Sequence, residues 1–192
     1  MDIRIKDNST GTVAKVTPEF QLETRAETLS HQHYISREFA QTFQVIGVTD
    51  TLTAATIPVL HIKNDDPERD LVISYIRLQI VDPNATLPGV GDYFQLGLGT
   101  TISGGSAVTP VNTNASSGKV ASVTATHSTP SSSGTFSELD RWYPTADGDS
   151  VTYNKDGSII LGLNDTFEIR IVSTSTAGIA YARTTFMMVD KE

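Results

Sequence analysis

Four acidic residues form the densest group of potential metal ligands in the chain. They are Asp65, Asp66, Glu68 and Asp70, in a stretch whose composition predicts a loop. Carboxylates bind Ca²⁺ when several surround one point, but the spacing and the glycine of an EF-hand loop are absent. Lys63 and Arg69 also offset part of the negative charge. We therefore expect a solvated loop, with a weak cation site as the alternative.

A second potential metal site involves two histidines. His31 and His33 are two positions apart, so their side chains would share one face of an extended strand. No third ligand is apparent nearby, and no zinc-site spacing is matched. The chain also has no cysteine, which excludes thiolate ligands and disulfides. We expect an exposed polar patch at these histidines and no bound metal.

The patterns typical of enzymes are missing. No Gly-x-Ser-x-Gly sequence places a serine on a nucleophile elbow. The glycines of residues 97–102 lack the strand, third glycine and helix of a dinucleotide-binding turn. A glycosidase needs two paired carboxylates, and sequence alone does not select two among 22 acidic residues. We expect no enzymatic activity and no cofactor.

Two adjacent aromatic residues follow a charged one in the sequence Arg-Trp-Tyr-Pro. Trp142, the only tryptophan, either anchors the core or a loop or contributes to a binding surface. In the second case Trp142 and Tyr143 would form an interface or a glycan-stacking site, because aromatic side chains dominate such contacts. Both interpretations are open at this level.

Length and charge restrict the classes of partner. The 192 residues are most simply one domain with a core of its own. The net charge of −8 disfavours binding to nucleic acid or to an anionic membrane. No run approaches the roughly 18 apolar residues of a membrane-spanning helix. The amino terminus lacks the apolar core of a secretory signal. We expect a soluble protein that is made in the cytoplasm.

Alternation of apolar and polar residues dominates the middle and the end of the chain. In the clearest strand, Ile76, Leu78 and Ile80 are expected to face the core, and Arg77 and Gln79 to face solvent. Similar short segments recur at roughly ten-residue spacing between turn signals, with almost no helix. The sequence therefore predicts an all-β fold, an antiparallel β-sandwich or jelly roll.

The last third predicts further strands and turns. Residues 150–153 and 158–163 are expected to form a hairpin, because the intervening Asp156-Gly157 pair suits a left-handed turn. The next strand is expected to direct Phe167, Ile169 and Ile171 inward.

The amino-terminal region differs from the rest. Residues 1–30 contain few large apolar groups and predict an extended N-terminal arm, with one helical turn at Leu22, Ala26 and Leu29 as the alternative. Residues 31–192 are then the β-sandwich domain. Ordering an arm costs roughly 1–2 kcal/mol per residue, which contacts with another chain must offset. The candidate contacts of the arm are Ile3, Ile5, Val13, Val16, Phe20 and Leu22.

A long polar stretch at 99–137 interrupts the predicted sandwich. It is rich in Ser, Thr, Gly and Ala, and it holds no acidic residue. Lys119 is its only lysine or arginine. We expect extended chain that lies across the domain surface or against a neighbouring subunit, with Val108 and Val111 as candidate contacts.

Several segments resemble structural proteins of tailed bacteriophages. The most distinctive is Gly-Gly-Ser-Ala-Val-Thr-Pro-Val-Asn at 104–112, which is followed by a Ser/Ala-rich run. Further similar segments lie at 34–38, 40–43, 59–64 and 71–77, and the closing strands from 157 onward match the general layout. Thr113-Asn114 departs from the Leu or Met that usually follows this motif.

This resemblance implies a non-enzymatic virion component. The expected function is that of a capsid decoration protein, which binds the outer head surface and stabilises it. Its partners would be the major capsid protein and copies of itself, including a homotrimer. The alternatives are a host-recognition module of a tail or head fibre, for which glycans would be the ligands, and another tail or neck component. The resemblance implies no catalytic residue.

Overall fold

The computed structural model describes residues 5–6, 13–16, 22–23, 36, 40–81, 91–128, 130–174 and 176–191. The chain divides into two compact units, Met1–Ser30 and His31–Glu192. Every element with assigned bounds in these residues is a β-strand, and every strand pair is antiparallel. The predicted all-β, antiparallel class is confirmed.

The described part of the first unit is a small sheet. Its strands are β1 (Ile5–Lys6), β2 (Val13–Val16) and β3 (Leu22–Glu23), in the order β1-β2-β3. These short strands are extended chain whose backbone groups pair with one another, and contact of this region with another chain stays a prediction. Leu22 belongs to a strand, whereas Ala26 and Leu29 lie outside the described residues. Of the candidate contacts, Ile3 and Phe20 also lie outside them.

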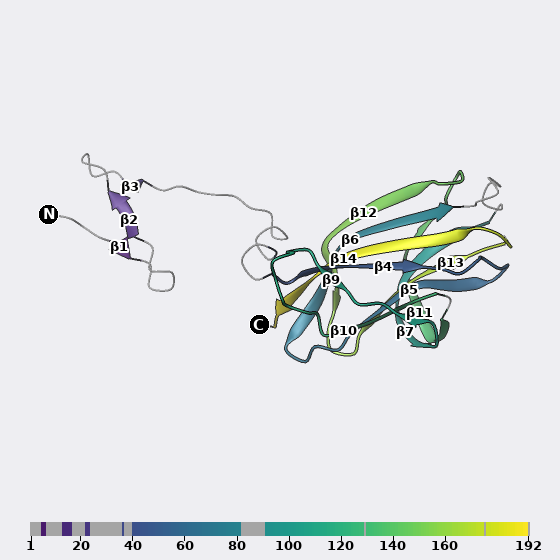
Figure 1. The fold of residues 1–192 in the computed structure, drawn as a ribbon, viewed down its shortest axis with the longest axis horizontal. Helices are drawn as coiled ribbons and strands as arrows, with labels where there is room; N and C mark the ends of the chain where they lie inside the picture. Colours follow the sequence, from purple (N-terminus) through teal and green to yellow (C-terminus); the bar gives the residue numbers. More distant parts are fainter. Residues whose placement is uncertain are drawn as a thin grey trace. The chain divides into compact units, whose positions relative to one another are not determined.

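The second unit is a sandwich of two sheets (Figure 1). The six-stranded sheet has the order β11-β7-β13-β5-β10-β8, and the five-stranded sheet has the order β12-β6-β14-β4-β9. The longer strands are β4 (Thr42–Val48), β5 (Thr56–Asn64), β6 (Arg69–Val81), β7 (Tyr93–Ser103), β11 (Ser131–Trp142), β12 (Ser150–Leu161), β13 (Thr166–Val172) and β14 (Ile179–Asp190).

These eight longer strands pair in a nested order. The first, β4, pairs with the last, β14, and the second, β5, pairs with the second-last, β13. In the same way β6 pairs with β12 and β7 with β11. Successive strands of this set also alternate between the two sheets, except β7 and β11, which are neighbours in the six-stranded sheet. This wrapping is that of a jelly roll.

The core lies between the two sheets. Leu60 and Ile169 of the six-stranded sheet and Leu78 and Phe186 of the five-stranded sheet are fully buried. Phe186 stacks on Phe43 of the neighbouring strand, with ring centroids 5.8 Å apart. The predicted inward residues of β6 (Ile76, Leu78 and Ile80) and of β13 (Phe167, Ile169 and Ile171) are all buried, which confirms their assignment.

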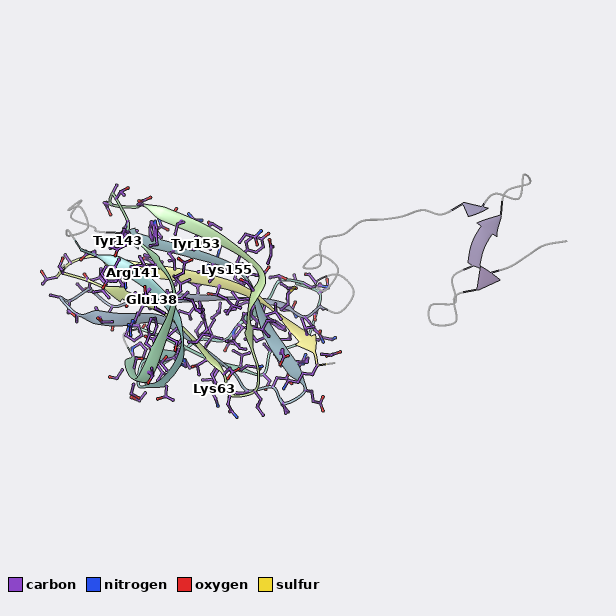
Figure 2. All side chains as sticks on the ribbon, turned by 180° about the vertical axis from the view of Figure 1, so that it is seen from behind. Lys63, Glu138, Arg141, Tyr143, Tyr153 and Lys155 are labelled. Atoms are coloured by element: carbon purple, nitrogen blue, oxygen red, sulfur yellow. The ribbon has the colours of Figure 1, made fainter. Side chains whose placement is uncertain are left out.

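One side of the sandwich is closed by an ion pair between edge strands. Lys155 of β12 lies 2.8 Å from the Asp140 carboxylate of β11, and its ammonium lies 4.8 Å from the Tyr153 ring centroid. Burial, and then the charge of Asp140, raises the pKa of Tyr153. Tyr153 and Lys155 are labelled in Figure 2.

The polar stretch 99–137 is built into the sandwich. It contains the end of β7, the start of β11 and three shorter strands, β8 (Ser106–Ala107), β9 (Val111–Asn112) and β10 (Val123–His127). β10 and β8 extend the six-stranded sheet beyond β5, and β9 extends the other sheet beyond β4. The stretch is extended as predicted, but its strands belong to this chain's own sheets. Its few apolar residues suffice because it occupies sheet edges.

The predicted hairpin at Asp156-Gly157 is wrong. β12 continues from Ser150 to Leu161, and both of its halves, 150–154 and 159–161, pair with β6 and not with each other. The register shifts between Asn154 and Ile159, and both Asp156 and Gly157 have positive φ, +40° and +82°. The pair therefore forms a β-bulge, which uses the same left-handed conformation as a turn without reversing the chain.

Candidate functional site

An exposed face of the five-stranded sheet carries the best candidate for a binding surface. On one row across three strands, Arg183 of β14 lies opposite Ile46 of β4 on one side and Arg77 of β6 on the other. Tyr181 and Gln79 are paired in the neighbouring row. Because alternate residues of a strand point to opposite faces, these side chains project away from the core.

We call this surface the arginine face and define it by six residues. They are Ile46, Tyr75, Arg77, Gln79, Tyr181 and Arg183. Ile46 is 52% exposed, and the tyrosines are 38% and 37% exposed. A shallow groove of about 160 Å³ lies between five of these residues and Ala182. Tyrosine, arginine and isolated large apolar groups are typical of interface hot spots.

The two arginines of this face have no acidic partner among the described residues. Arg77 and Arg183 are directly opposite each other, and like charges in that position destabilise a sheet. The chain as a whole has a net charge of −8, so acidic residues are abundant elsewhere. An uncompensated pair of cations on an acidic protein costs folding stability, and a partner with carboxylates would offset that cost.

The Arg141 side chain organises a second surface cluster, on the six-stranded sheet. It forms a two-point ion pair with Glu138, at 2.7 and 2.8 Å, and donates to the Tyr143 hydroxyl at 3.1 Å. Its guanidinium lies 4.5 Å from the centroid of the Tyr93 ring, within cation–π range. The Arg141 hydrogen bonds lower the pKa of Glu138. Figure 2 labels Tyr143, Arg141 and Glu138, which all come from the end of β11 and the residue after it.

Trp142 points away from this cluster toward the core. Its ring stacks on that of Phe94 with centroids 5.5 Å apart, and it packs against the buried cluster. Tyr143 is 52% exposed. Of the two interpretations of Trp142, the structure supports the core anchor, and only Tyr143 is available at the surface.

This difference gives a stability prediction. Trp142→Ala is expected to lower the free energy of unfolding by about 2 kcal/mol, since half-buried aromatic area is lost. Tyr143→Ala is expected to change it by less than about 0.5 kcal/mol, as for most surface substitutions. Urea denaturation followed by far-UV circular dichroism measures both values. Equal losses in the two variants would contradict the assignment of Trp142 as the anchor.

The acidic loop is a set of ion pairs and backbone contacts. Asp66 accepts hydrogen bonds from the Glu68 and Arg69 amides, both at 3.0 Å, and its carboxylate lies 2.6 Å from the Arg69 guanidinium. Burial alone would raise the pKa of Asp66. The hydrogen bonds and the Arg69 charge lower it by more than burial raises it, so the pKa lies below its ordinary value. Asp65 pairs with Lys63 at 2.8 Å. Within the described ranges no group of three or more His, Asp or Glu residues could hold a metal ion, and His31 and His33 lie outside those ranges.

Val108 and Val111 are placed differently by the structure. Val108 packs partly against the core, and its amide donates to Ala125 at 3.0 Å. Val111, in the edge strand β9, is 68% exposed. The neighbouring Asn112 holds the loop that follows, donating to the Ala40 carbonyl at 2.7 Å and accepting from the Asn114 amide at 2.9 Å. The distinctive part of the 104–112 motif therefore includes a structural anchor.

A buried polar group lies on the outer surface of the six-stranded sheet. His61 and Glu168 are opposite each other on β5 and β13, and they are 3% and 0% exposed. The bend of β7 after Gly99 brings the Thr100 carbonyl to 3.3 Å from His61 Nε2 and to 2.8 Å from the Thr166 hydroxyl. Sequence alternation places Glu168 away from the core, but it does not show that the end of β7 covers it.

His61 gives a pH-dependent prediction. Burial lowers its pKa below the ordinary 6.5, although the Thr100 carbonyl and Glu168 oppose the shift. At a pH between the lowered pKa of His61 in the folded chain and its ordinary value in the unfolded chain, the unfolded chain binds a proton that the folded chain does not bind. Folding stability should therefore decrease as the pH falls below about 6.5. In His61→Gln, whose amide can still reach the Thr100 carbonyl, this loss should be smaller. Urea denaturation at about pH 7.5 and about pH 5.5 measures the difference, and an equal loss in both proteins would contradict the prediction.

The fold and the arginine face together define the class of this protein: an antiparallel jelly roll with an exposed cationic surface that has no acidic partner in the described part of the chain. Comparison with protein-family models finds no match, and comparison with curated proteins finds none either. The part of the chain that the structure describes contains no helix with the length and apolar character needed to span a membrane. The two arginines were not identified as a site from the sequence. For Arg77, the alternation along β6 indicated only that it faces solvent. The sequence could not place Arg183 opposite it, because the pairing of β6 with β14 is a long-range contact.

Proposed function

We propose that this chain is a non-enzymatic structural protein of a tailed-phage virion, and that it decorates the outer surface of the capsid. The observation that carries the proposal is the arginine face, in which Arg77 and Arg183 lie opposite each other without an acidic partner among the described residues. The resemblance of the 104–112 motif to phage structural proteins supports the same conclusion. Jelly rolls are also a common architecture of viral capsid domains, which is support by analogy of fold.

The arginine face suits an acidic patch of the major capsid protein. Carboxylates placed there would pair with both arginines and remove their mutual repulsion. Ile46 and Tyr181 would supply apolar contact area beside the charges. Because the same contact is repeated over a symmetric shell, a modest affinity at each site suffices when the protein also contacts its own copies.

The location on the particle is tested by copy number. Quantitative mass spectrometry of purified virions should find this chain at the copy number of the major capsid protein or at a simple fraction of it. Immunogold labelling should be distributed over the head. A handful of copies at one vertex or at the tail would overturn the proposal and favour the fibre, tail or neck alternatives.

The contribution of the arginine face is tested with a double variant. Arg77→Gln/Arg183→Gln should reduce binding to particles that lack the protein by about tenfold or more, as for loss of two interfacial charge contacts. Its free energy of unfolding should stay equal or rise by a few tenths of a kcal/mol, because opposed like charges are removed. Lys63→Gln/Arg141→Gln changes the net charge equally at other positions and is the matched control. Co-sedimentation with particles measures binding, and equal losses in the two double variants would contradict a specific role of this face.

A further inference from the structure

We propose that a cavity on the outer surface of the six-stranded sheet is a binding site for a neutral saccharide. This site is separate from the arginine face, which belongs to the other sheet, and its function does not depend on attachment to a capsid. The cavity has a volume of about 460 Å³, within the range of roughly 300–1,000 Å³ that small-molecule sites occupy.

The cavity lies where the end of β7 and the start of β11 fold over β5 and β13. Its lining is dominated by hydroxyl-bearing and charged side chains, with two prolines as the apolar surfaces. The residues on which the proposal depends are Thr56, Ser131, Ser132, Glu168 and Arg170. A small polar cavity of this composition matches a ligand whose surface is covered by hydroxyl groups.

Glu168 is the acceptor of the proposed site. It is fully buried, and one of its oxygens, Oε2, accepts hydrogen bonds from the hydroxyls of Thr100 at 2.5 Å and of Ser132 at 2.6 Å. The other oxygen, Oε1, has no hydrogen-bond donor among the described residues. His61, on the opposite strand, does not donate to it. A buried carboxylate oxygen without a donor is costly, and a ligand hydroxyl would remove that cost.

Arg170 is the donor. It is two residues after Glu168 on β13, so the two side chains project from the same face of the strand. Its Nε donates to Gln95 Oε1 at 2.9 Å, and its guanidinium lies 3.4 Å from the centroid of the Phe136 ring. These contacts hold the group in place, while its two Nη groups have no acceptor among the described residues. They are oriented donors at the wall of the cavity.

The combination of charges selects the class of ligand. Glu168 and Arg170 carry opposite charges, so the pair as a whole gives no net attraction to a free cation or to a free anion. A neutral molecule with neighbouring hydroxyls can donate to Glu168 and accept from Arg170 at the same time. The hydroxyls of Thr56 and Ser131 add further donors and acceptors at the rim. Because Glu168 Oε1 is covered, we expect binding to include a side-chain rotation of Glu168 or Ser132 that uncovers it.

The test uses the full chain and a panel of methyl glycosides of common hexoses and N-acetylhexosamines. Saturation-transfer NMR should detect binding of at least one of them. Glu168→Gln should weaken that binding by roughly 10-fold to 100-fold, because its single acceptor oxygen is needed by the Thr100 and Ser132 hydroxyls and the remaining amide nitrogen cannot accept a hydroxyl proton. Ser131→Trp should abolish it by filling the cavity. Ser133→Trp, an equal change at an exposed residue of the same strand that does not line the cavity, is the matched control.

Any of three results would overturn the proposal. No binding of any glycoside at tens of millimolar would do so, as would binding that is unchanged in Glu168→Gln and Ser131→Trp. Glycine and other amino acids form a second arm, and binding of these zwitterions without any glycoside would show a different class of ligand. If a glycoside binds, tighter binding of its oligosaccharides would indicate a polymeric source such as a cell-surface glycan, and equal affinity would indicate a free sugar. Loss of particle attachment in the arginine-face variant does not affect these outcomes.

Discussion

Asn64→Ala is expected to lower the free energy of unfolding by about 3 to 4 kcal/mol. Asn64 ends β5 and is fully buried. Its amide nitrogen donates to the carbonyls of Arg69 and Leu161, each at 2.9 Å, and its Oδ1 accepts from the Asp66 amide at 3.0 Å. One side chain thus joins the ends of three segments. Alanine would leave these backbone groups without their partner, and each buried group so orphaned costs roughly 1–3 kcal/mol.

Asn154→Ala is the matched control for this prediction. Asn154 is exposed, and among the described residues its Oδ1 accepts only from the Asp156 amide, at 3.2 Å. Its removal should change the free energy of unfolding by less than about 0.5 kcal/mol. Urea denaturation measures both variants, with an unchanged slope indicating that the surface exposed on unfolding is the same. If Asn64→Ala were no more destabilising than the control, the role of Asn64 in joining the three segments would be refuted.

Gly47→Ala is expected to lower the free energy of unfolding by about 3 kcal/mol. At Gly47, β4 of one sheet passes close to β5 of the other. A Cβ added there would lie 2.4 Å from the Val59 carbonyl oxygen and 2.6 Å from the Leu60 Cβ. One obstructing atom is a backbone oxygen and the other is a Cβ bonded directly to the backbone, so no side-chain rotation can relieve the clash. The two sheets would have to separate locally.

Gly118→Ala provides the comparison for Gly47→Ala. A Cβ at Gly118 meets no atom within 4 Å, so this variant should be neutral or slightly more stable than wild type, because alanine restricts the unfolded chain. Differential scanning calorimetry should show a lower midpoint for Gly47→Ala only. Similar midpoints in the two variants would mean that the sheets are not closely packed at this crossing.

Local sequence pattern predicted the elements of the sandwich better than their connections. The alternation around Ile76 and Leu78 placed their strand and its buried face correctly, because inward and outward positions differ in hydrophobicity along one strand. Asp156-Gly157 was assigned to a hairpin because a bulge and a tight turn both use residues of positive φ. The difference between them depends on whether the partner strand, β6, continues alongside.

The candidate sites were less accessible from sequence than the elements. Arg77 was expected to face solvent, but its position opposite Arg183 follows from pairing between strands about a hundred residues apart. The predicted inward direction of Phe167 and Ile169 implies an outward Glu168, but its burial depends on the bend of β7 after Gly99. Trp142 was left between two interpretations, and its stacking on Phe94 favours the structural one.

The sequence by itself determined that this protein is an all-β sandwich with an acidic overall charge and a distinct amino-terminal region. The charge and the distinct amino-terminal region depend on composition. The fold class depends on short-range periodicity, which is visible within a single strand. Only the tertiary structure decided the jelly-roll order, the incorporation of the polar stretch into the sheets, and the grouping of Arg77 with Arg183 and of Glu168 with Arg170 in a cavity. Strand pairing and the overlap of β7 with its neighbours bring these groups together, and such long-range contacts leave no local pattern in the chain.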